Sequence, residues 1–134
     1  GWASFCEEIL FDSEFFSGAA DSLMMAIRRL WRAMRGRAEL RIHTGRYTLD
    51  EAAQELAGVG LVTKEHAEAM VRRYALKPGY QLAYPIGRRK FRQLYTAFLR
   101  QGHSPAHFVR NVLAHGEIGF DHLAERLLYE ASDV

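Results

Sequence analysis

The feature that most constrains the fold is a helical spacing of apolar residues that recurs between breaks at glycine and proline. Apolar residues three and four positions apart share one face of an α-helix. The longest such stripe consists of Met24, Ile27, Trp31, Met34, Ala38 and Ile42, widened by Leu23 and Leu30. No stretch sustains the alternation that is typical of a strand. We therefore predict an all-α fold, a bundle-like array of six to seven helices in a single domain over residues 1–134.

Local signals divide the chain into these helices. Thr48 and Glu51 have the spacing of a capping box, Thr63 is a second N-cap, and Ser104-Pro105 joins an N-cap to a proline at the first helical position. Asp21 or Ser22 is the expected cap of the long arginine-rich helix. The predicted helices cover about 2–16, 22–44, 49–56, 64–76, 80–101, 105–115 and 120–129.

Charge and composition exclude several classes of protein. The net charge of the 134 residues is only +2, although arginines cluster on two predicted helices. We therefore expect Arg28, Arg32, Arg35 and Glu39 to form a solvated face or to pair with an adjoining domain, and we expect no nucleic-acid partner. No apolar run reaches the roughly 20 residues that cross a bilayer, so we expect no membrane partner. Cys6 is the single cysteine, which excludes an intrachain disulfide and makes a reducing, cytoplasmic compartment the default, although export of a longer parent protein is compatible with the sequence.

The stretch from Arg72 to Gly87 concentrates groups that could hold a ligand. Pro78 and Gly79 break the helix, and Tyr80 and Tyr84 follow one turn apart, so both hydroxyls can point into one cleft. Gln81 lies at the same edge. The alternative interpretation is that both tyrosines are amphipathic core residues with exposed hydroxyls.

Motifs for other chemistry are missing. The chain has no His-Glu-x-x-His zinc motif, no Gly-x-Ser-x-Gly nucleophile elbow and no phosphate-binding loop. The six histidines are scattered, so we interpret them as solvated side chains at helix ends. Glu7 and Glu8 are adjacent and diverge by roughly 100° on a helix, so they cannot both face one site, and we expect one of them to be a plain surface charge.

Three segments carry recognisable motifs in order. Gly1–Glu8 is similar to a Glu-Gly-Trp-Ala-x-Tyr-x-Glu segment, with Phe5 in place of the tyrosine. Ile42–Ala52 is similar to Leu-His-Thr-Gly-Arg-x-Thr-x-Glu-Glu-Ala, and Arg73–Gly87 to Arg-Tyr … Pro-x-Gln-x-x-x-Tyr-x-x-Gly. Together they resemble the bacterial "domain of unknown function 885" family over nearly the whole chain.

That family resembles helical zinc-dependent metallopeptidases with a metal-binding His-Glu helix upstream of these motifs. The resemblance implies that residues 1–134 are the C-terminal, substrate-cleft part of a longer protein whose zinc ligands mostly precede Gly1. It implies Glu7 as a further metal ligand or as a partner of one. Tyr84 would stabilise the oxyanion of the tetrahedral intermediate. The substrate-binding residues would be Arg73, Gln81 and His43, to which helical spacing alone adds Tyr80.

We therefore expect the C-terminal helical portion of a zinc-dependent peptide hydrolase, which binds a peptide substrate and is inactive without its upstream part. No zinc is expected on this chain alone. The alternative is a helical protein–protein interaction or dimerisation module without catalytic activity. A homodimer is expected under either hypothesis, because a piece of a larger fold exposes apolar surface.

Overall fold

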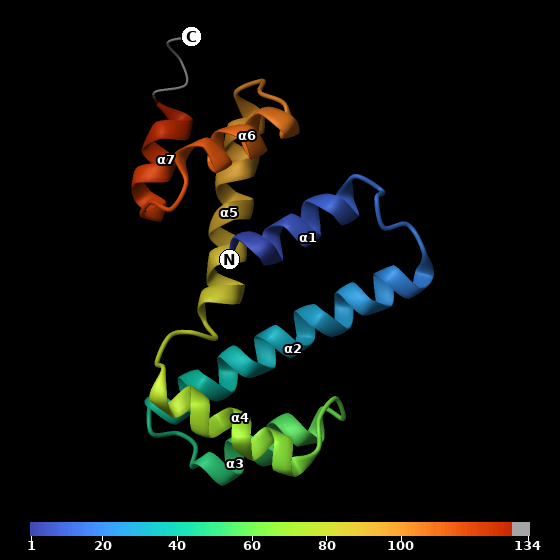
Figure 1. Ribbon diagram of the computed structural model, residues 1–134, viewed down its shortest axis with the longest axis vertical. Helices are drawn as coiled ribbons and strands as arrows, with labels where there is room; N and C mark the ends of the chain where they lie inside the picture. The colour runs from blue at the N-terminus through green and yellow to red at the C-terminus, as the bar shows by residue number, and fades with distance from the viewer. Residues whose placement is uncertain (130–134) are drawn as a thin grey trace. The chain divides into compact units, whose positions relative to one another are not determined.

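The computed structural model describes residues 1–129 and confirms the all-α prediction, with no strand in that range (Figure 1). The helices are α1 Trp2–Asp12, α2 Ala19–His43, α3 Leu49–Gly58, α4 Lys64–Leu76, α5 Ala83–Arg100, α6 Pro105–His115 and α7 Phe120–Leu128. They fall into two compact units, residues 1–89 and the residues from 90 onward, and α5 belongs to both. The single-domain organisation stays a prediction. No described helix combines the length and the apolarity that a bilayer crossing requires.

Caps that depend only on neighbouring residues lie where the sequence predicts them. The Thr48 hydroxyl accepts the Glu51 N–H at 3.2 Å while the Glu51 carboxylate accepts the Thr48 N–H at 2.8 Å, which is a complete capping box. The hydroxyls of Thr63 and Ser104 cap α4 and α6 by accepting the N–H groups of His66 and His107. These three helix starts can therefore be predicted from neighbouring residues alone.

Other helix boundaries differ from the prediction. The first helix ends at Asp12 rather than near residue 16, and the Ser13 hydroxyl donates to the carbonyl of Leu10 at the end of α1. Gly18 is the N-cap of α2, and its N–H donates to the Asp21 carboxylate at 3.1 Å. Asp21 therefore supports the start of α2 from within its first turn instead of capping it. The fifth helix begins at Ala83, so Tyr80 lies in the preceding turn and not on the helix.

The core of the first unit lies among α2, α3 and α4, which pack against one another. Alanines supply much of it, and small side chains let helix backbones approach closely. The buried cluster consists of Ala38, Ala52, Ala53, Leu56, Ala67, Met70, Val71 and Tyr74. Figure 1 shows α3 and α4 running side by side beneath the C-terminal half of α2. This packing fixes the position of α4, so its opposite face can form one wall of a pocket.

The long helix α2 buries the C-terminal half of its predicted apolar stripe, where Ala38 lies in the core and Trp31, Met34 and Ile42 pack against it, but it also buries part of its polar face. Leu23, Met24 and Leu30, in its N-terminal half, are 63%, 54% and 52% exposed. Glu39, on the supposedly solvated face, is fully buried. The prediction of a solvated polar face is therefore wrong at this position, and the reason is that the polar face of α2 is itself a packing face.

A close backbone approach joins the start of α1 to α5. A Cβ atom built on Gly87 would lie 2.6 Å from the Cα atom of Gly1, and the reverse substitution meets the Gly87 backbone at the same distance. Neither position can hold a side chain without displacing main chain. The two glycines thus allow α1 to contact α5 inside the first unit.

The second unit is built on aromatic packing among the end of α5, α6 and α7. Phe98 and Phe108 are fully buried with their ring centroids 5.5 Å apart, and the His103 ring lies 4.4 Å from that of Phe98. Lys90 lies over the Phe120 ring at 5.1 Å. His103 and His107 are thus members of an aromatic cluster.

Candidate functional site

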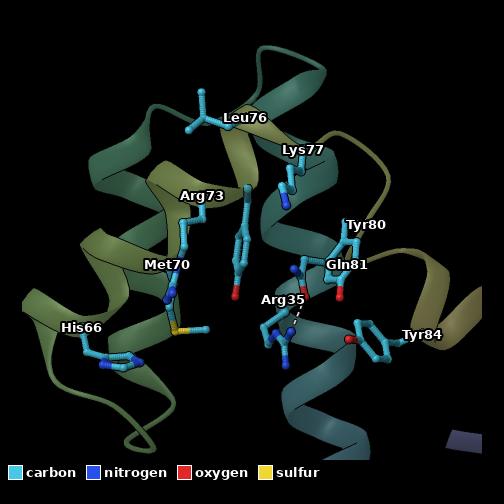
Figure 2. A pocket seen from close by; sticks show the side chains of 10 residues that line it. Arg35, His66, Met70, Arg73, Leu76, Lys77, Tyr80, Gln81 and Tyr84 are labelled. Carbon is cyan, nitrogen blue, oxygen red and sulfur yellow. Dashed lines mark hydrogen bonds between the residues drawn. The ribbon is translucent and has the colours of Figure 1, made fainter. Parts of the chain in front are cut away.

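The described residues of the first unit form a pocket of about 490 Å³ between α4 and the turn that leads into α5. This volume falls in the range of about 300–1,000 Å³ that is usual for small-ligand sites. His66, Met70 and Arg73 of α4 form one wall in Figure 2, and Tyr80, Gln81 and Tyr84 form the opposite wall. Arg35 of α2 lies between the two walls. The break at Pro78 and Gly79 therefore makes one side of the pocket.

A buried acid holds this turn in place. The Glu39 carboxylate accepts the backbone N–H of Gln81 at 3.1 and 3.2 Å and that of Leu82 at 3.1 Å. The first N–H groups of a helix have no partner within the helix, and a negative charge at this end is favourable. Glu39 thus supplies the acceptors that the start of α5 lacks, and it fixes the pocket-forming turn to α2.

Arg35 is the cation at the base of the pocket. Its guanidinium donates to the side-chain oxygen of Gln81 and lies 5.5 Å from the centre of the Tyr84 ring. Two side chains of the opposite wall are therefore positioned by one arginine. The buried Nε–H of Arg35 has no acceptor among the described residues.

Tyr80 and Tyr84 contribute paired phenols. Their ring centroids are 5.9 Å apart and nearly perpendicular, an edge-to-face geometry that aromatic pairs prefer. A hydrogen bond between the two phenols raises the pKa of Tyr84, burial raises this pKa further, and the positive charges of Arg35 and Arg32 oppose the rise. The direction of this shift means that the neutral phenol is favoured and that Tyr84 donates its proton to Tyr80 in this hydrogen bond.

The α4 wall contributes hydrogen-bond donors that have no acceptor among the described residues. Tyr74 is 5% exposed, and its hydroxyl proton has no acceptor within residues 1–129, because the neighbouring Arg35 can only donate. Burial raises the pKa of the Tyr74 phenol, and Arg35 opposes that rise. Arg73 and Lys77 are exposed, and the described part of the chain places no carboxylate in ion-pair contact with either of them. Among the described residues, no Asp or Glu lines the pocket.

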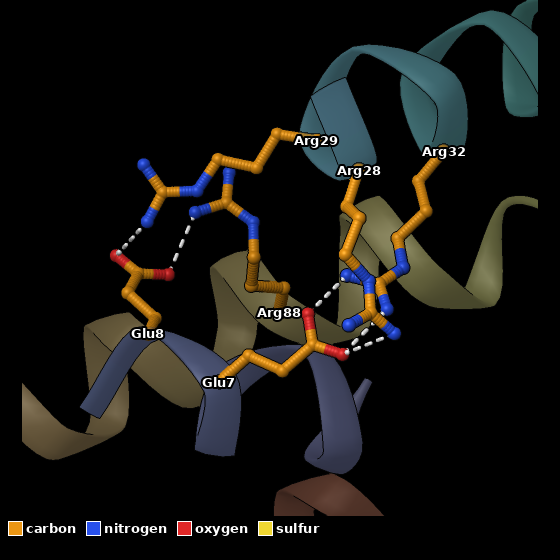
Figure 3. A network of polar contacts seen from close by, with 6 residues as sticks. All are labelled: Glu7, Glu8, Arg28, Arg29, Arg32 and Arg88. Carbon is orange, nitrogen blue, oxygen red and sulfur yellow. Dashed lines mark hydrogen bonds and ion pairs between the residues drawn. The ribbon is translucent and has the colours of Figure 1, made fainter. Parts of the chain in front are cut away.

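Glu7 and Glu8 lie in a separate network with four arginines (Figure 3). Both oxygens of Glu7 accept from Arg32, at 2.6 and 2.8 Å, and Arg28 lies 3.2 Å away. The Arg32 hydrogen bond holds the pKa of Glu7 below its ordinary value. A carboxylate bound in this way is occupied by cations and positions α2 against α1.

The surroundings of Glu8 contradict the prediction that one of the two glutamates is a plain surface charge. Its side chain is 7% exposed and accepts from Arg88 at 2.8 Å, with Arg29 at 3.9 Å. The two glutamates do face different partners, as their adjacency predicts, but neither is a plain surface charge. The arginines of α2 and α5 supply a second set of anchors for the first helix.

The predicted substrate-binding residues come together with one exception. Arg73, Tyr80, Gln81 and Tyr84 all line the pocket, whereas His43 does not. The His43 ring donates from Nε2 to the carbonyl of Tyr74 at 3.1 Å, and the same carbonyl also accepts the backbone N–H of Lys77 at 3.1 Å. His43 therefore contacts the main chain of the lining residue Tyr74, and its own side chain is not part of the lining. Whether any of these residues binds a substrate stays a prediction.

Sequence reasoning missed several lining residues. Arg35 was assigned to a solvated face, and Tyr74 was read only as part of a motif. His66, Met70 and Lys77 recur at helical spacing with Arg73, so the face of α4 that includes Arg73 was the available signal. Within residues 1–129, no three His, Cys, Asp or Glu side chains lie close enough to hold a metal ion.

These features define an all-α protein with a cationic, tyrosine-lined pocket beside a helix break. The chain belongs to the family described as "Bacterial protein of unknown function (DUF885)", whose model matches residues 1–127. The match confirms the resemblance of the three ordered motifs. No curated protein and no solved structure matches the chain.

Proposed function

We propose that this chain forms the substrate-binding wall of a zinc-dependent peptide hydrolase. The observation that carries the proposal is the pocket itself, in which phenols and the cations Arg35, Arg73 and Lys77 converge, with no acidic side chain of residues 1–129 in the lining. Hydrolysis of a peptide bond develops negative charge on the carbonyl oxygen, and donors aimed at that charge lower the barrier. Tyr84, kept protonated by its surroundings, is such a donor.

In this proposal, each pocket residue has a role that its position supports. Tyr84 donates to the developing oxyanion when the substrate replaces Tyr80 as the acceptor of its proton, and Tyr80 holds the Tyr84 phenol until then. Arg73 lies on the opposite wall, where its guanidinium can hold a carbonyl or carboxylate of the substrate. Gln81 and His43 position these groups, Gln81 through Arg35 and His43 through the backbone of Tyr74.

In our proposal, as the family resemblance implies, the zinc is held mostly by residues outside the described part of the chain. Bound zinc would lower the pKa of a water molecule and polarise the scissile carbonyl. Glu7 contacts only arginines in the described structure, which supports a positioning role beside such a site more than direct ligation. The chain's own contribution is to bind, orient and donate.

The experiment uses the longest natural protein that contains this sequence. Purified protein is analysed for bound zinc and assayed against a mixed library of short peptides, with and without a chelator. Tyr84→Phe should lower kcat by about 10²-fold with little change in melting temperature, as expected for loss of one oxyanion donor. Hydrolysis that is absent or insensitive to the chelator would refute a zinc-dependent hydrolase. An unchanged kcat in Tyr84→Phe would refute the role of Tyr84 as the oxyanion donor.

A further inference from the structure

The pocket lining contains more hydrogen-bond donors than acceptors, and two of its buried donor groups have no acceptor within residues 1–129. The Tyr74 hydroxyl and the Nε–H of Arg35 both belong to lining residues, and neither finds an acceptor among the described residues. Buried polar groups in folded proteins are almost always paired with protein, water or ligand. A water molecule or a ligand in the pocket is the kind of acceptor that would complete these donors.

The charge of the pocket specifies what kind of acceptor this is. Arg35, Arg73 and Lys77 place three formal positive charges on the lining, and the lining has no carboxylate. The nearest buried acid, Glu39, lies outside the lining, and its oxygens already accept the N–H groups of Gln81 and Leu82. An anion with two acceptor oxygens, such as a carboxylate, matches both the charge and the unpartnered donors.

The pocket also offers apolar contact next to these donors. Met70 and Leu76 belong to the same lining, and Leu76 is 80% exposed. A C-terminal amino acid residue presents a carboxylate and a side chain from one Cα atom.

We propose that this pocket is a subsite for the free C-terminal carboxylate of a peptide, so that the enzyme acts near the carboxyl end of its substrates. The naming of the ligand as a peptide rests on the proposed function. Arg73 and Lys77 attract the carboxylate at the entrance, Tyr74 and Arg35 donate to it at the base, and Met70 contacts the terminal side chain.

The test measures binding separately from hydrolysis. Three N-acetylated tripeptides are titrated calorimetrically into the longest natural protein that contains this chain: Ala-Ala-Phe as the free acid, Ala-Ala-Phe as the C-terminal amide, and Ala-Asp-Phe as the amide. We expect the free acid to bind at least about 30-fold more tightly than either amide, as for a charged group held by more than one charge-assisted hydrogen bond. The hydrolysis rates of the same peptides are measured in parallel.

Two variants on adjacent positions of α4 provide the matched comparison. Arg73→Gln should weaken binding of the free acid about tenfold and leave binding of the amide unchanged. Arg72→Gln removes the same charge from a side chain that lies outside the pocket, at the Glu68 ion pair, and should bind the free acid like the wild type. Tyr74→Phe removes only the unpartnered hydroxyl, and it should also weaken free-acid binding while the protein stays folded.

The outcomes separate the two proposals. Equal affinity for acid and amide, tighter binding of the Asp-containing amide, or equal effects of Arg72→Gln and Arg73→Gln would each overturn the carboxylate subsite, even if peptides are hydrolysed. Acid-selective binding without hydrolysis of any peptide would retain the subsite and refute the hydrolase.

Discussion

Replacing Glu39 by alanine should destabilise the first unit by about 2–4 kcal/mol, because two backbone N–H groups lose their acceptor and each buried unsatisfied group costs about 1–3 kcal/mol. The donors are Gln81, whose residue is 6% exposed, and the half-buried Leu82, which water can reach in part. This access to water places the expected loss in the lower half of the summed range. Glu39→Gln keeps one acceptor oxygen, so it should cost only about 1 kcal/mol for the lost charge at the helix start.

The assay is urea unfolding followed by the helical circular dichroism signal, with Glu68→Ala as the control. Glu68 is an acidic residue on α4 that makes only exposed ion pairs with Lys64 and Arg72, which are worth less than about 1 kcal/mol. Glu39→Ala should also weaken ligand binding under conditions in which the protein is still folded, since the turn with Tyr80 loses its attachment to α2. A free energy of unfolding within about 0.5 kcal/mol of the wild type, the usual range for a neutral surface substitution, would refute the role of Glu39 as the anchor.

Three further predictions address other contacts in the first unit. Gly87→Ala should destabilise by about 1–3 kcal/mol through collision with the Gly1 backbone, whereas Gly36→Ala, whose Cβ would meet Leu82 only at 3.5 Å, should stabilise by up to about 1 kcal/mol in the same unfolding assay; equal signs for the two variants would contradict the close approach. Tyr74→Phe should leave the free energy of unfolding unchanged or raise it by up to about 1 kcal/mol, because an unpartnered buried hydroxyl is removed, and a clear loss would show that the hydroxyl has a partner. The lowered pKa of Glu7 adds stability that is present above pH 4.5 and is lost as the pH falls through the pKa of the folded state, so Glu7→Gln should flatten the acid-side fall in a pH series of denaturant melts; parallel curves for wild type and variant would disprove that contribution.

The sequence predicts features that depend on near neighbours. The capping box at Thr48 and Glu51 and the N-cap at Ser104 need only a few consecutive residues, so they are readable without the fold. The meeting of Tyr80 and Tyr84 in one pocket was also predicted, but for a different reason. Tyr80 lies in a turn and not one helical turn before Tyr84, and the break at Pro78 brings the two rings together.

Contacts across the chain were not predictable in this way. A charged stripe on a helix has the same pattern whether it faces water or a distant carboxylate. Arg32 pairs with Glu7, and Arg35 pairs with Gln81. Glu39 accepts the backbone N–H groups of Gln81 and Leu82, which reach it only because the fold brings the start of α5 beside α2. The partners lie 25 to 46 positions apart, beyond the reach of any local spacing rule.

The position of Glu39 separates the framework of the pocket from its chemistry. This acid holds the turn without being part of the lining, so the side chains at Arg73, Lys77 and Tyr80 can be exchanged while the hollow between α4 and α5 persists. Redesign of this protein toward other ligands could therefore alter the walls one residue at a time and leave the supporting carboxylate untouched.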